Sequence, residues 1–200
     1  MALPLAHRIN PNTDSLELLC QTALEHIGED PTRTGLRLTP RRFKESLLEL
    51  TNGYNQDPYE IAKGAIFEGD YSEIVLVKKV EFYSLCEHHL LPFFGHAHIA
   101  YLPDRCIVGL SKIPQIVNVF ARRLQVQERL TEEIASALQA VLKPRGVACL
   151  MEARHLCMLM RGTQSHSGVV STTAMKGEFV DNDIRRAEFF RLVNSETPSF

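Results

Sequence analysis

The sequence predicts an α+β protein in which an antiparallel four-stranded sheet carries two helices on one face, behind an N-terminal helical extension. Three observations predict it. Apolar residues in the first part recur at helical spacing, later segments are rich in Val, Ile, Phe and Tyr, and two helical segments separate two pairs of such strands. We therefore expect an extension over 1–65 and a catalytic domain over 66–200.

The extension should contain two helices. Apolar side chains recur at helical spacing over 14–29, where Asp14 or Ser15 can cap the first helix. Two prolines and a glycine then predict a loop, and Pro40 stands where a first helical position is expected. The second helix should run to Asn52–Gly53.

The sheet domain should contain four strands and three helices. We expect helices at 112–123, with Ser111 as N-cap, and at 128–143, and a closing helix at 181–193. The free edges of such a sheet invite pairing with other copies of the chain. The predicted strands cover 73–85, 95 onward, 147–160 and 169–179.

Composition excludes several classes of protein. Lys and Arg number 22 against 24 Asp and Glu, a formal net charge of −2, which argues against binding to nucleic acid or to an anionic membrane. No apolar run approaches the roughly 18 residues of a membrane span, and the N-terminus lacks a secretory pattern. Five scattered cysteines do not form a secreted disulfide framework. We expect a cytoplasmic protein.

The strongest chemical signal is Cys86-Glu87-His88-His89. A thiolate and an imidazole three residues apart can reach one ion, and zinc favours this mixture of sulfur and nitrogen. His155 and Cys157 lie on the third predicted strand, where residues i and i+2 share a face. Three ligands and an open position would make a catalytic site, whereas all four residues would make a structural one. Spacing leaves both open, and His88 beside a ligand favours the catalytic site.

Two polar segments have both a functional and an ordinary interpretation. Gly109 to Lys112 enters a helix, where exposed amides, a hydroxyl and an ammonium can bind an anion; alone, the segment is more simply an N-cap beside a solvated lysine. Gln127 and Glu128 lie in a charged stretch between two helices. Such a stretch is usually a solvated face, but a carboxylate there can accept hydrogen bonds from a guanine edge.

In this order, CEHHLLPFFGHAHIAYLP, VGLSK, RRLQVQERLT and EARHLCMLMRG closely resemble GTP cyclohydrolase I, from about residue 29 to the C-terminus. The resemblance implies a tunnelling fold assembled through its sheet edges into a ring, a homodecamer of two pentamers with active sites between subunits. It implies zinc-dependent hydrolysis of GTP at C8 to formate and 7,8-dihydroneopterin triphosphate. That reaction feeds tetrahydrofolate and other pterin or deazapurine pathways.

The resemblance also assigns roles to residues. It implies one Zn²⁺ per subunit held by Cys86, His89 and Cys157, with His88 and His155 as proton carriers. The implied substrate contacts are Glu128 for guanine with Gln127 beside it, Ser111, Lys112 and Arg161 for the triphosphate, and Arg42 from a neighbouring subunit.

Two positions depart from the family pattern. Gln115 stands where the family usually has a triphosphate-binding arginine, and Gly168–Val170 replaces residues that are usually polar or basic. A related purine-nucleotide hydrolase with altered phosphate specificity is therefore one alternative. A non-catalytic ring that binds a pterin or purine is another. A third is the related deazaguanine nitrile reductase, which uses a cysteine nucleophile and nicotinamide and lacks the CEHH cluster.

Overall fold

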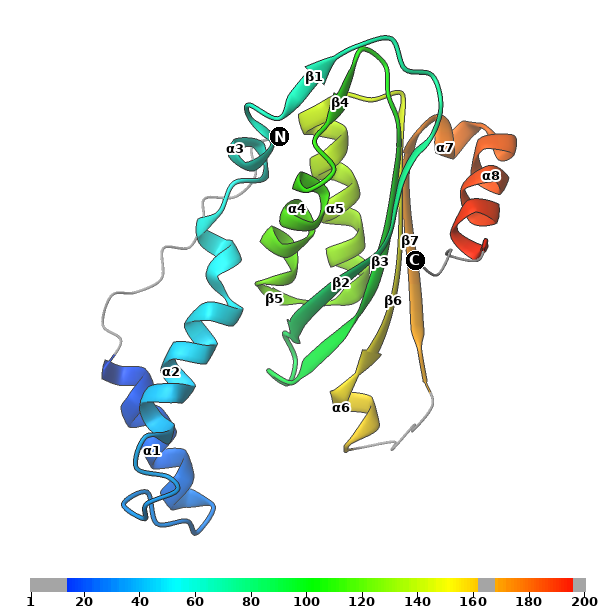
Figure 1. Cartoon of the computed structure of the whole chain (residues 1–200). Helices are drawn as coiled ribbons and strands as arrows, with labels where there is room; N and C mark the ends of the chain where they lie inside the picture. Colours follow the sequence, from blue (N-terminus) through cyan, green and yellow to red (C-terminus); the bar gives the residue numbers. More distant parts are fainter. Residues whose placement is uncertain (1–13, 162–167, 196–200) are drawn as a thin grey trace. The chain divides into compact units, whose positions relative to one another are not determined.

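The computed structural model describes residues 14–161 and 168–195 (Figure 1). The chain divides into two compact units, Met1–Gln56 and Asp57–Phe200. The boundary expected at residue 65 stays a prediction, and each unit is described by itself. None of the helices in the described part has the length and apolar character needed to span a membrane.

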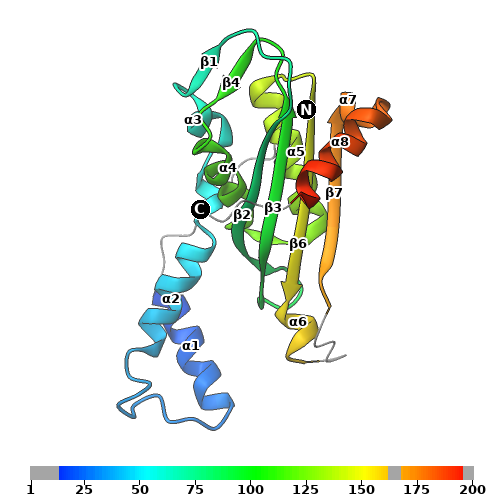
Figure 2. The ribbon, with the colours of Figure 1, turned by 45° about the vertical axis from the view of Figure 1, so that its right-hand side comes forward.

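The first unit is a pair of packed helices, as the sequence predicts. Helix α1 (Asp14–His26) lies against α2 (Thr39–Leu50), and a short 3₁₀ helix, η1 (Asn52–Asn55), follows (Figure 2). Lys44 on α2 forms an ion pair with Glu17 on α1. Pro40 lies in the first turn of α2, where its missing N–H costs no helical hydrogen bond.

The second unit is built on the four predicted antiparallel strands. These are β2 (Val75–Cys86), β3 (Pro92–Leu102), β6 (Gly146–His155) and β7 (Val170–Gly177), hydrogen-bonded in that order. The described residues add a fifth strand, β5 (Leu124–Gln125), which pairs parallel to the end of β2. Two residues are too few to show a strand periodicity in the sequence.

A small second sheet precedes the helices. Strand β1 (Ile66–Glu68) pairs antiparallel with β4 (Cys106–Val108), after the short helix α3 (Pro58–Ala62). These three-residue strands were not predicted, because they are too short to show a periodic pattern. In chain order, β1 connects α3 to β2, and β4 connects β3 to the helix that follows.

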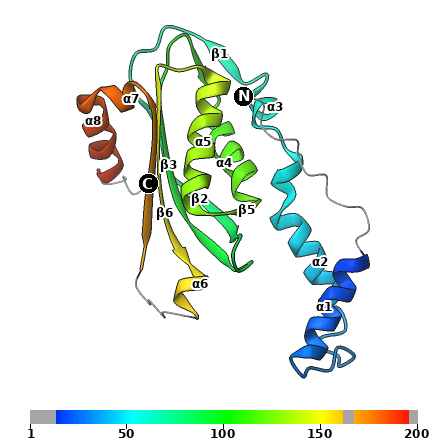
Figure 3. The ribbon, with the colours of Figure 1, turned by 180° about the vertical axis from the view of Figure 1, so that it is seen from behind.

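Two helices cover one face of the main sheet, as predicted. They are α4 (Lys112–Ala121) and α5 (Gln127–Leu142), and Figure 3 shows them side by side against the strands. Between helices and sheet lies the larger core, in which Phe82, Phe93 and Ile134 are fully buried. Burying side chains of this size supplies about 1.5–3 kcal/mol each.

The closing helix is confirmed as α8 (Asp183–Asn194), and a short helix that was not predicted, α7 (Glu178–Asp181), precedes it. Both pack on the opposite face of the sheet from α4 and α5, through Phe179 and Phe189. Asn182 causes the break between them because its backbone is extended and its side chain accepts hydrogen bonds from two amides of the first turn of α8.

Gly95 provides a test of how tightly β3 and β6 pack. A Cβ at this position would lie 1.9 Å from the backbone oxygen of Glu152, whereas a Cβ at Gly109 would meet its nearest atom at 3.7 Å. We expect Gly95→Ala to lower the free energy of unfolding by about 3 kcal/mol, the upper end for overpacking, and Gly109→Ala to change it little. Urea unfolding of both variants checks this, and equal midpoints would contradict it.

Candidate active site and metal cluster

The turn between β2 and β3 brings Cys86 and His89 together. The amide of Leu90 donates to the carbonyl of Cys86 at 2.8 Å, and the amide of Cys86 donates to the carbonyl of Leu91 at 2.9 Å. Leu90 adopts a left-handed backbone conformation, with φ of 53°, which is unusual for a bulky side chain. The chain thus reverses within a few residues and returns His89 to the thiol of Cys86.

The end of β6 carries the second part of the site. His155 is the last residue of β6 and pairs with Phe93, near the start of β3. Cys157 lies on a short helix, α6 (Leu156–Leu159), so the prediction that it shares a strand face with His155 is wrong. Leu156 would face Pro92 in a continued ladder, and proline has no N–H to donate. The strand therefore ends and the chain turns into a helix.

Three side chains converge at this end of the sheet. One ligand atom each from Cys86, His89 and Cys157 lies within 4.8 Å of the other two, and Cys86 Sγ lies 3.7 Å from His89 Nδ1. A tetrahedral zinc ion, with bonds of about 2.3 Å to sulfur and 2.0 Å to nitrogen, separates such donors by about 3.5 Å. The geometry and the donor types both fit zinc.

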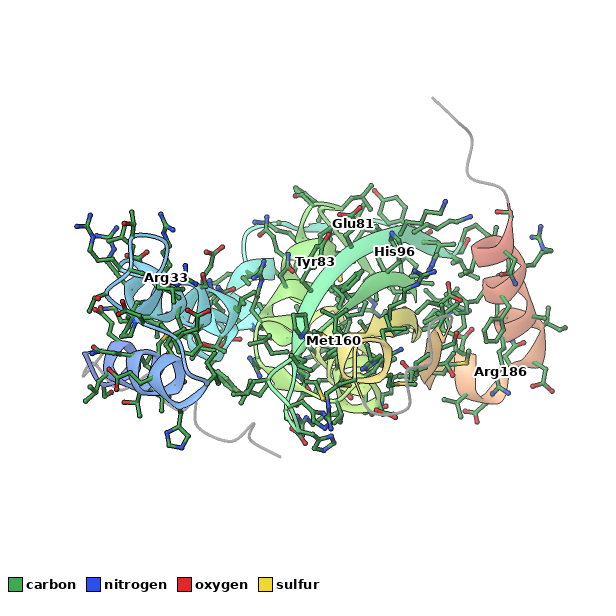
Figure 4. The ribbon with its side chains drawn as sticks, turned by 90° about the horizontal axis from the view of Figure 1, so that it is seen from below. Arg33, Glu81, Tyr83, His96, Met160 and Arg186 are labelled. Carbon is green, nitrogen blue, oxygen red and sulfur yellow. The ribbon has the colours of Figure 1, made fainter. Side chains whose placement is uncertain are left out.

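The electrostatics of the cluster also suit a cation. Burial raises the pKa of the Cys157 thiol, and the neighbouring Cys86 thiol raises it further. Two thiols held together in this way resist forming two thiolates unless a positive charge lies between them. Arg161, exposed just after α6, is close enough that its charge partly opposes this rise in pKa. Figure 4 looks onto this end of the molecule, where Met160 after α6 is labelled.

His155 is held rigidly beside the cluster. Its ring stacks on Phe93 with centroids 4.6 Å apart and planes 5° apart, and its Nε2 lies 2.8 Å from Oε1 of Gln127. Burial lowers the pKa of His155, and the charge of Glu128 partly offsets that effect. The two effects on this pKa oppose each other, and the lowering by burial is the larger.

His88 has a different setting. It projects from the turn with 64% of its side chain exposed, and its Nε2 lies 3.8 Å from a carboxylate oxygen of Glu87. Its ring centroid lies 6.2 Å from that of His89. His88 is thus near the cluster but open to a ligand or to another copy of the chain.

Sequence reasoning gave no role to the groups that brace the turn. Glu87 forms an ion pair with Arg129 on α5, and the hydrogen bond from Arg129 lowers the pKa of that carboxyl. Arg129 also donates to Oε1 of Gln125 at 3.0 Å, and the amide of Glu87 donates to the carbonyl of Gln125 at 3.0 Å. The signal was present, since Glu87 lies inside the CEHH motif, but its partner could not be read from spacing.

Two of the expected phosphate contacts, Ser111 and Lys112, lie away from the metal cluster of their own chain. Ser111 and Lys112 begin α4, whereas the end of this helix leads to β5 and the Cys86 turn (Figure 1). Ten residues of α-helix span about 15 Å. One chain therefore does not bring this helix start to its own metal cluster. Ser111 is at the N-cap as predicted, but its side chain makes no capping hydrogen bond.

Two other predicted contacts can be located. Lys112 Nζ donates to Oε1 of Gln115 at 3.4 Å, so the residue that departs from the family pattern binds the lysine beside it. Arg42 lies exposed on α2 of the first unit. Gly168–Val170 is the other segment that differs from the family pattern. Residues 162–167, between Arg161 and this segment, lie outside the described residues.

Comparison with known proteins identifies the family. A family model described as GTP cyclohydrolase I matches residues 16–194. The chain belongs to the GTP cyclohydrolase I family. It is therefore an enzyme with the activity that defines this family, as the CEHH, GLSK and QVQERLT motifs predict.

Relatives of the GTP cyclohydrolase I family cover most of the chain. GTP cyclohydrolase 1 of Chlorobaculum tepidum is 57% identical over 172 residues, which are 86% of this chain and 77% of the relative. That of Campylobacter lari is 52% identical over 182 residues, 91% of this chain and 96% of the relative. A solved structure titled archaeosine synthase QueF-Like, in the apo form, covers 54% of this chain and 97% of its own, with 15% identity and a TM-score of 0.44.

The brace between Glu87 and Arg129 should support the metal cluster. We expect Arg129→Met to weaken zinc binding about tenfold, because groups that orient a metal-binding segment typically contribute 10- to 100-fold in affinity. Arg145→Met is the matched control, since Arg145 pairs with Glu178 at similar exposure through bonds of 2.7 and 2.9 Å. Competition with a chromophoric chelator measures both, and equal affinities would contradict the brace.

Proposed function

We propose that the chain catalyses zinc-dependent hydrolysis of GTP at C8 of guanine. In the net reaction, one GTP and one water give formate and 7,8-dihydroneopterin triphosphate. The observation that carries this proposal is the convergence of Cys86, His89 and Cys157 within 4.8 Å, with His155 held by Gln127 at the end of the neighbouring strand. A zinc ion held there, one per subunit, would supply Lewis acidity towards water.

In this proposal His155 and His88, the two histidines beside the cluster that do not bind the metal, carry out the proton transfers. His155 takes up and returns a proton at the ring nitrogen that Gln127 does not engage, as water adds to the purine and the imidazole ring opens. His88, exposed on the turn, serves the other side of the reacting ring. His155 is held by Gln127 and Phe93, whereas His88 is exposed. These different settings suit a reaction that moves protons at both the purine and the ribose.

Glu128 is the group that binds guanine in this proposal. It is exposed in the first turn of α5, and its charge reaches His155. A carboxylate there accepts hydrogen bonds from the ring N–H and amino group of guanine and, because it is fixed to the helix, sets the distance from C8 to His155.

The triphosphate needs cations from more than one chain. Arg161 lies near the cluster of its own chain, whereas Ser111 and Lys112 lie at the far end of α4. We therefore assign these two to the site of a neighbouring subunit, together with Arg42. Strand β7 is at one edge of the main sheet and is available for pairing, which suits a ring and, in this proposal, a decamer of two pentamers.

The place of this enzyme in metabolism follows from the reaction. We propose that it is cytoplasmic and catalyses the first step of pterin and tetrahydrofolate biosynthesis. The extension over 1–65 would serve assembly and, through Arg42, the site of a neighbouring subunit, and the domain over 66–200 would carry the zinc and the two proton carriers.

Cys157→Ser tests the proposal directly. We expect the purified protein to bind one zinc per subunit and to form formate and dihydroneopterin triphosphate from GTP. Cys157→Ser should lose at least about a thousandfold of this activity, as expected when water activation is lost. Cys106→Ser is the control, because Cys106 is half-buried, lies outside the cluster, and its hydrogen bond to the carbonyl of Leu142 can be replaced by serine. Metal analysis measures the zinc content, and mass spectrometry detects the products. Full activity of Cys157→Ser would refute the proposed function.

Altered phosphate specificity is the second candidate, favoured by the hydrogen bond between Lys112 and Gln115. If the missing arginine weakens triphosphate binding, Gln115→Arg should lower the KM for GTP about tenfold, the value of one charge-assisted hydrogen bond, and leave that for GMP unchanged. Steady-state kinetics with GTP, GDP and GMP decides. A strong preference of the unmodified enzyme for GTP, with no gain from Gln115→Arg, would eliminate this candidate.

A further inference from the structure

We propose that Gln127 is a positioning residue for His155 and makes no contact with the purine. Its amide fixes the orientation and tautomer of the His155 ring, so that Nδ1 is the nitrogen offered to the substrate. This inference rests on the proposed role of His155 as a proton carrier, and it replaces the expectation that Gln127 reads guanine beside Glu128.

The side chain of Gln127 points into the protein. Gln127 is 1% exposed, whereas Glu128, the next residue of α5, is exposed. Successive residues of a helix project about 100° apart, so one of the pair can face the substrate while the other is directed at the sheet. Helix α5 packs on β6 and β7, and Gln127 reaches both strands.

The hydrogen bonds of Gln127 define which way its amide lies. Its Nε2 donates to the carbonyl of Met151 at 3.1 Å and to that of Val170 at 2.9 Å. Carbonyl oxygens only accept, so the NH₂ group must be on this side and Oε1 must face His155. The hydroxyl of Thr172 also lies 3.1 Å from Nε2, so three acceptors share the two hydrogens of this NH₂ group.

The amide orientation in turn defines the tautomer of His155. Because Oε1 only accepts, His155 Nε2, 2.8 Å away, must carry a hydrogen. A neutral ring protonated at Nε2 has its lone pair on Nδ1. Within 14–161 and 168–195, the hydrogen bond found at the His155 ring is the one at Nε2, and Nδ1 is not among the buried atoms that lack a partner. His155 Nδ1 is therefore open to solvent and to a ligand.

The network around Gln127 closes on itself. Thr131 Oγ1 lies 2.7 Å from Thr172 Oγ1 and donates to the backbone carbonyl of Gln127 at 2.7 Å. Because the hydroxyl hydrogen of Thr131 goes to that carbonyl, the hydrogen between the two hydroxyls comes from Thr172. The side chain and the backbone carbonyl of Gln127 are thus both engaged, and such a network favours one geometry.

A chemical consequence follows for the reaction. An amide oxygen cannot take up a proton at neutral pH, so a proton that His155 accepts at Nδ1 cannot leave through Gln127. The ring becomes an imidazolium with both nitrogens protonated, and it returns to neutrality by giving the Nδ1 proton back to the substrate. The same nitrogen is thus both base and acid, and the Nε2–H bond to Gln127 persists throughout.

Gln127→Met, which removes the hydrogen bonds at similar side-chain length, tests the proposal. We expect kcat for GTP to fall at least tenfold, since general acid–base catalysis contributes about 10²–10⁴-fold, while the Kd of a non-hydrolysable GTP analogue changes less than about twofold. Glu128→Gln should have the opposite pattern: the Kd of the GTP analogue should rise, and kcat should change less than in Gln127→Met. Gln139→Met is the matched control, because it makes the same change on the same helix and removes a hydrogen bond to the carbonyl of Pro144, outside the site, so it should keep kcat within about threefold of the unmodified enzyme.

A spectroscopic measurement of the His155 tautomer distinguishes loss of the positioning by Gln127 from a general disruption of the structure. Solid-state ¹⁵N NMR of histidine-labelled, metal-free protein, with His155 assigned by His155→Asn, should show Nε2 protonated and Nδ1 unprotonated. Gln127→Met should give a mixture of tautomers, and Gln139→Met should not. A Kd that rises in Gln127→Met with kcat unchanged, or His155 protonated at Nδ1 in the unmodified protein, would overturn the inference. The second result decides even if Gln127→Met does not fold.

Failure of the proposed function gives a different result. The tautomer is measured without substrate or metal. A protein that returns GTP intact but shows His155 protonated at Nε2 would contradict the proposed reaction and leave the positioning role of Gln127 standing.

Discussion

The pairing of β3 with β6 ends at Phe93 and His155, and the rest of the site depends on that end point. Before β3 lies the turn that carries Cys86 and His89, and after β6 lies the short helix that carries Cys157. Antiparallel pairing forces the start of one strand and the end of the other to lie side by side. Pro92 stops the ladder there, so a thiol about 70 residues further along the chain meets the first thiol.

The site also depends on buried polar groups. Gln127 and Thr131 are buried and form a hydrogen-bonded network with the half-buried Thr172, and each buried group would be costly if left without a partner. The network ties α5 to β6 and β7 at the place where His155 needs a fixed ring. By contrast His88 and Glu128 are exposed. The clamped groups orient the chemistry, and the open groups are available to the nucleotide.

The sequence predicted the long elements because their signals are local. The periodicity of apolar residues predicted the four strands and the helices α4 and α5. Ser111 marked the start of α4, and Pro40 marked the start of α2. The end of β6 was missed because it depends on Pro92, a residue on another strand. The inward orientation of Gln127 was missed because its partners lie 24 to 45 residues away. Cys86, His89 and Cys157 were identified through the family resemblance, since spacing alone left three- and four-ligand sites equally open.

X-ray absorption at the zinc edge of the purified protein tests the central claim most directly, because it counts the ligands. The account predicts two sulfur scatterers at about 2.3 Å and two lighter scatterers at about 2.0–2.1 Å, one from His89 and one from solvent. It also predicts that only one of the lighter ligands gives the outer-shell pattern of an imidazole. Two imidazole patterns beside two sulfurs would mean that His155 completes a closed structural site, and both the proposed reaction and the positioning role of Gln127 would then be wrong.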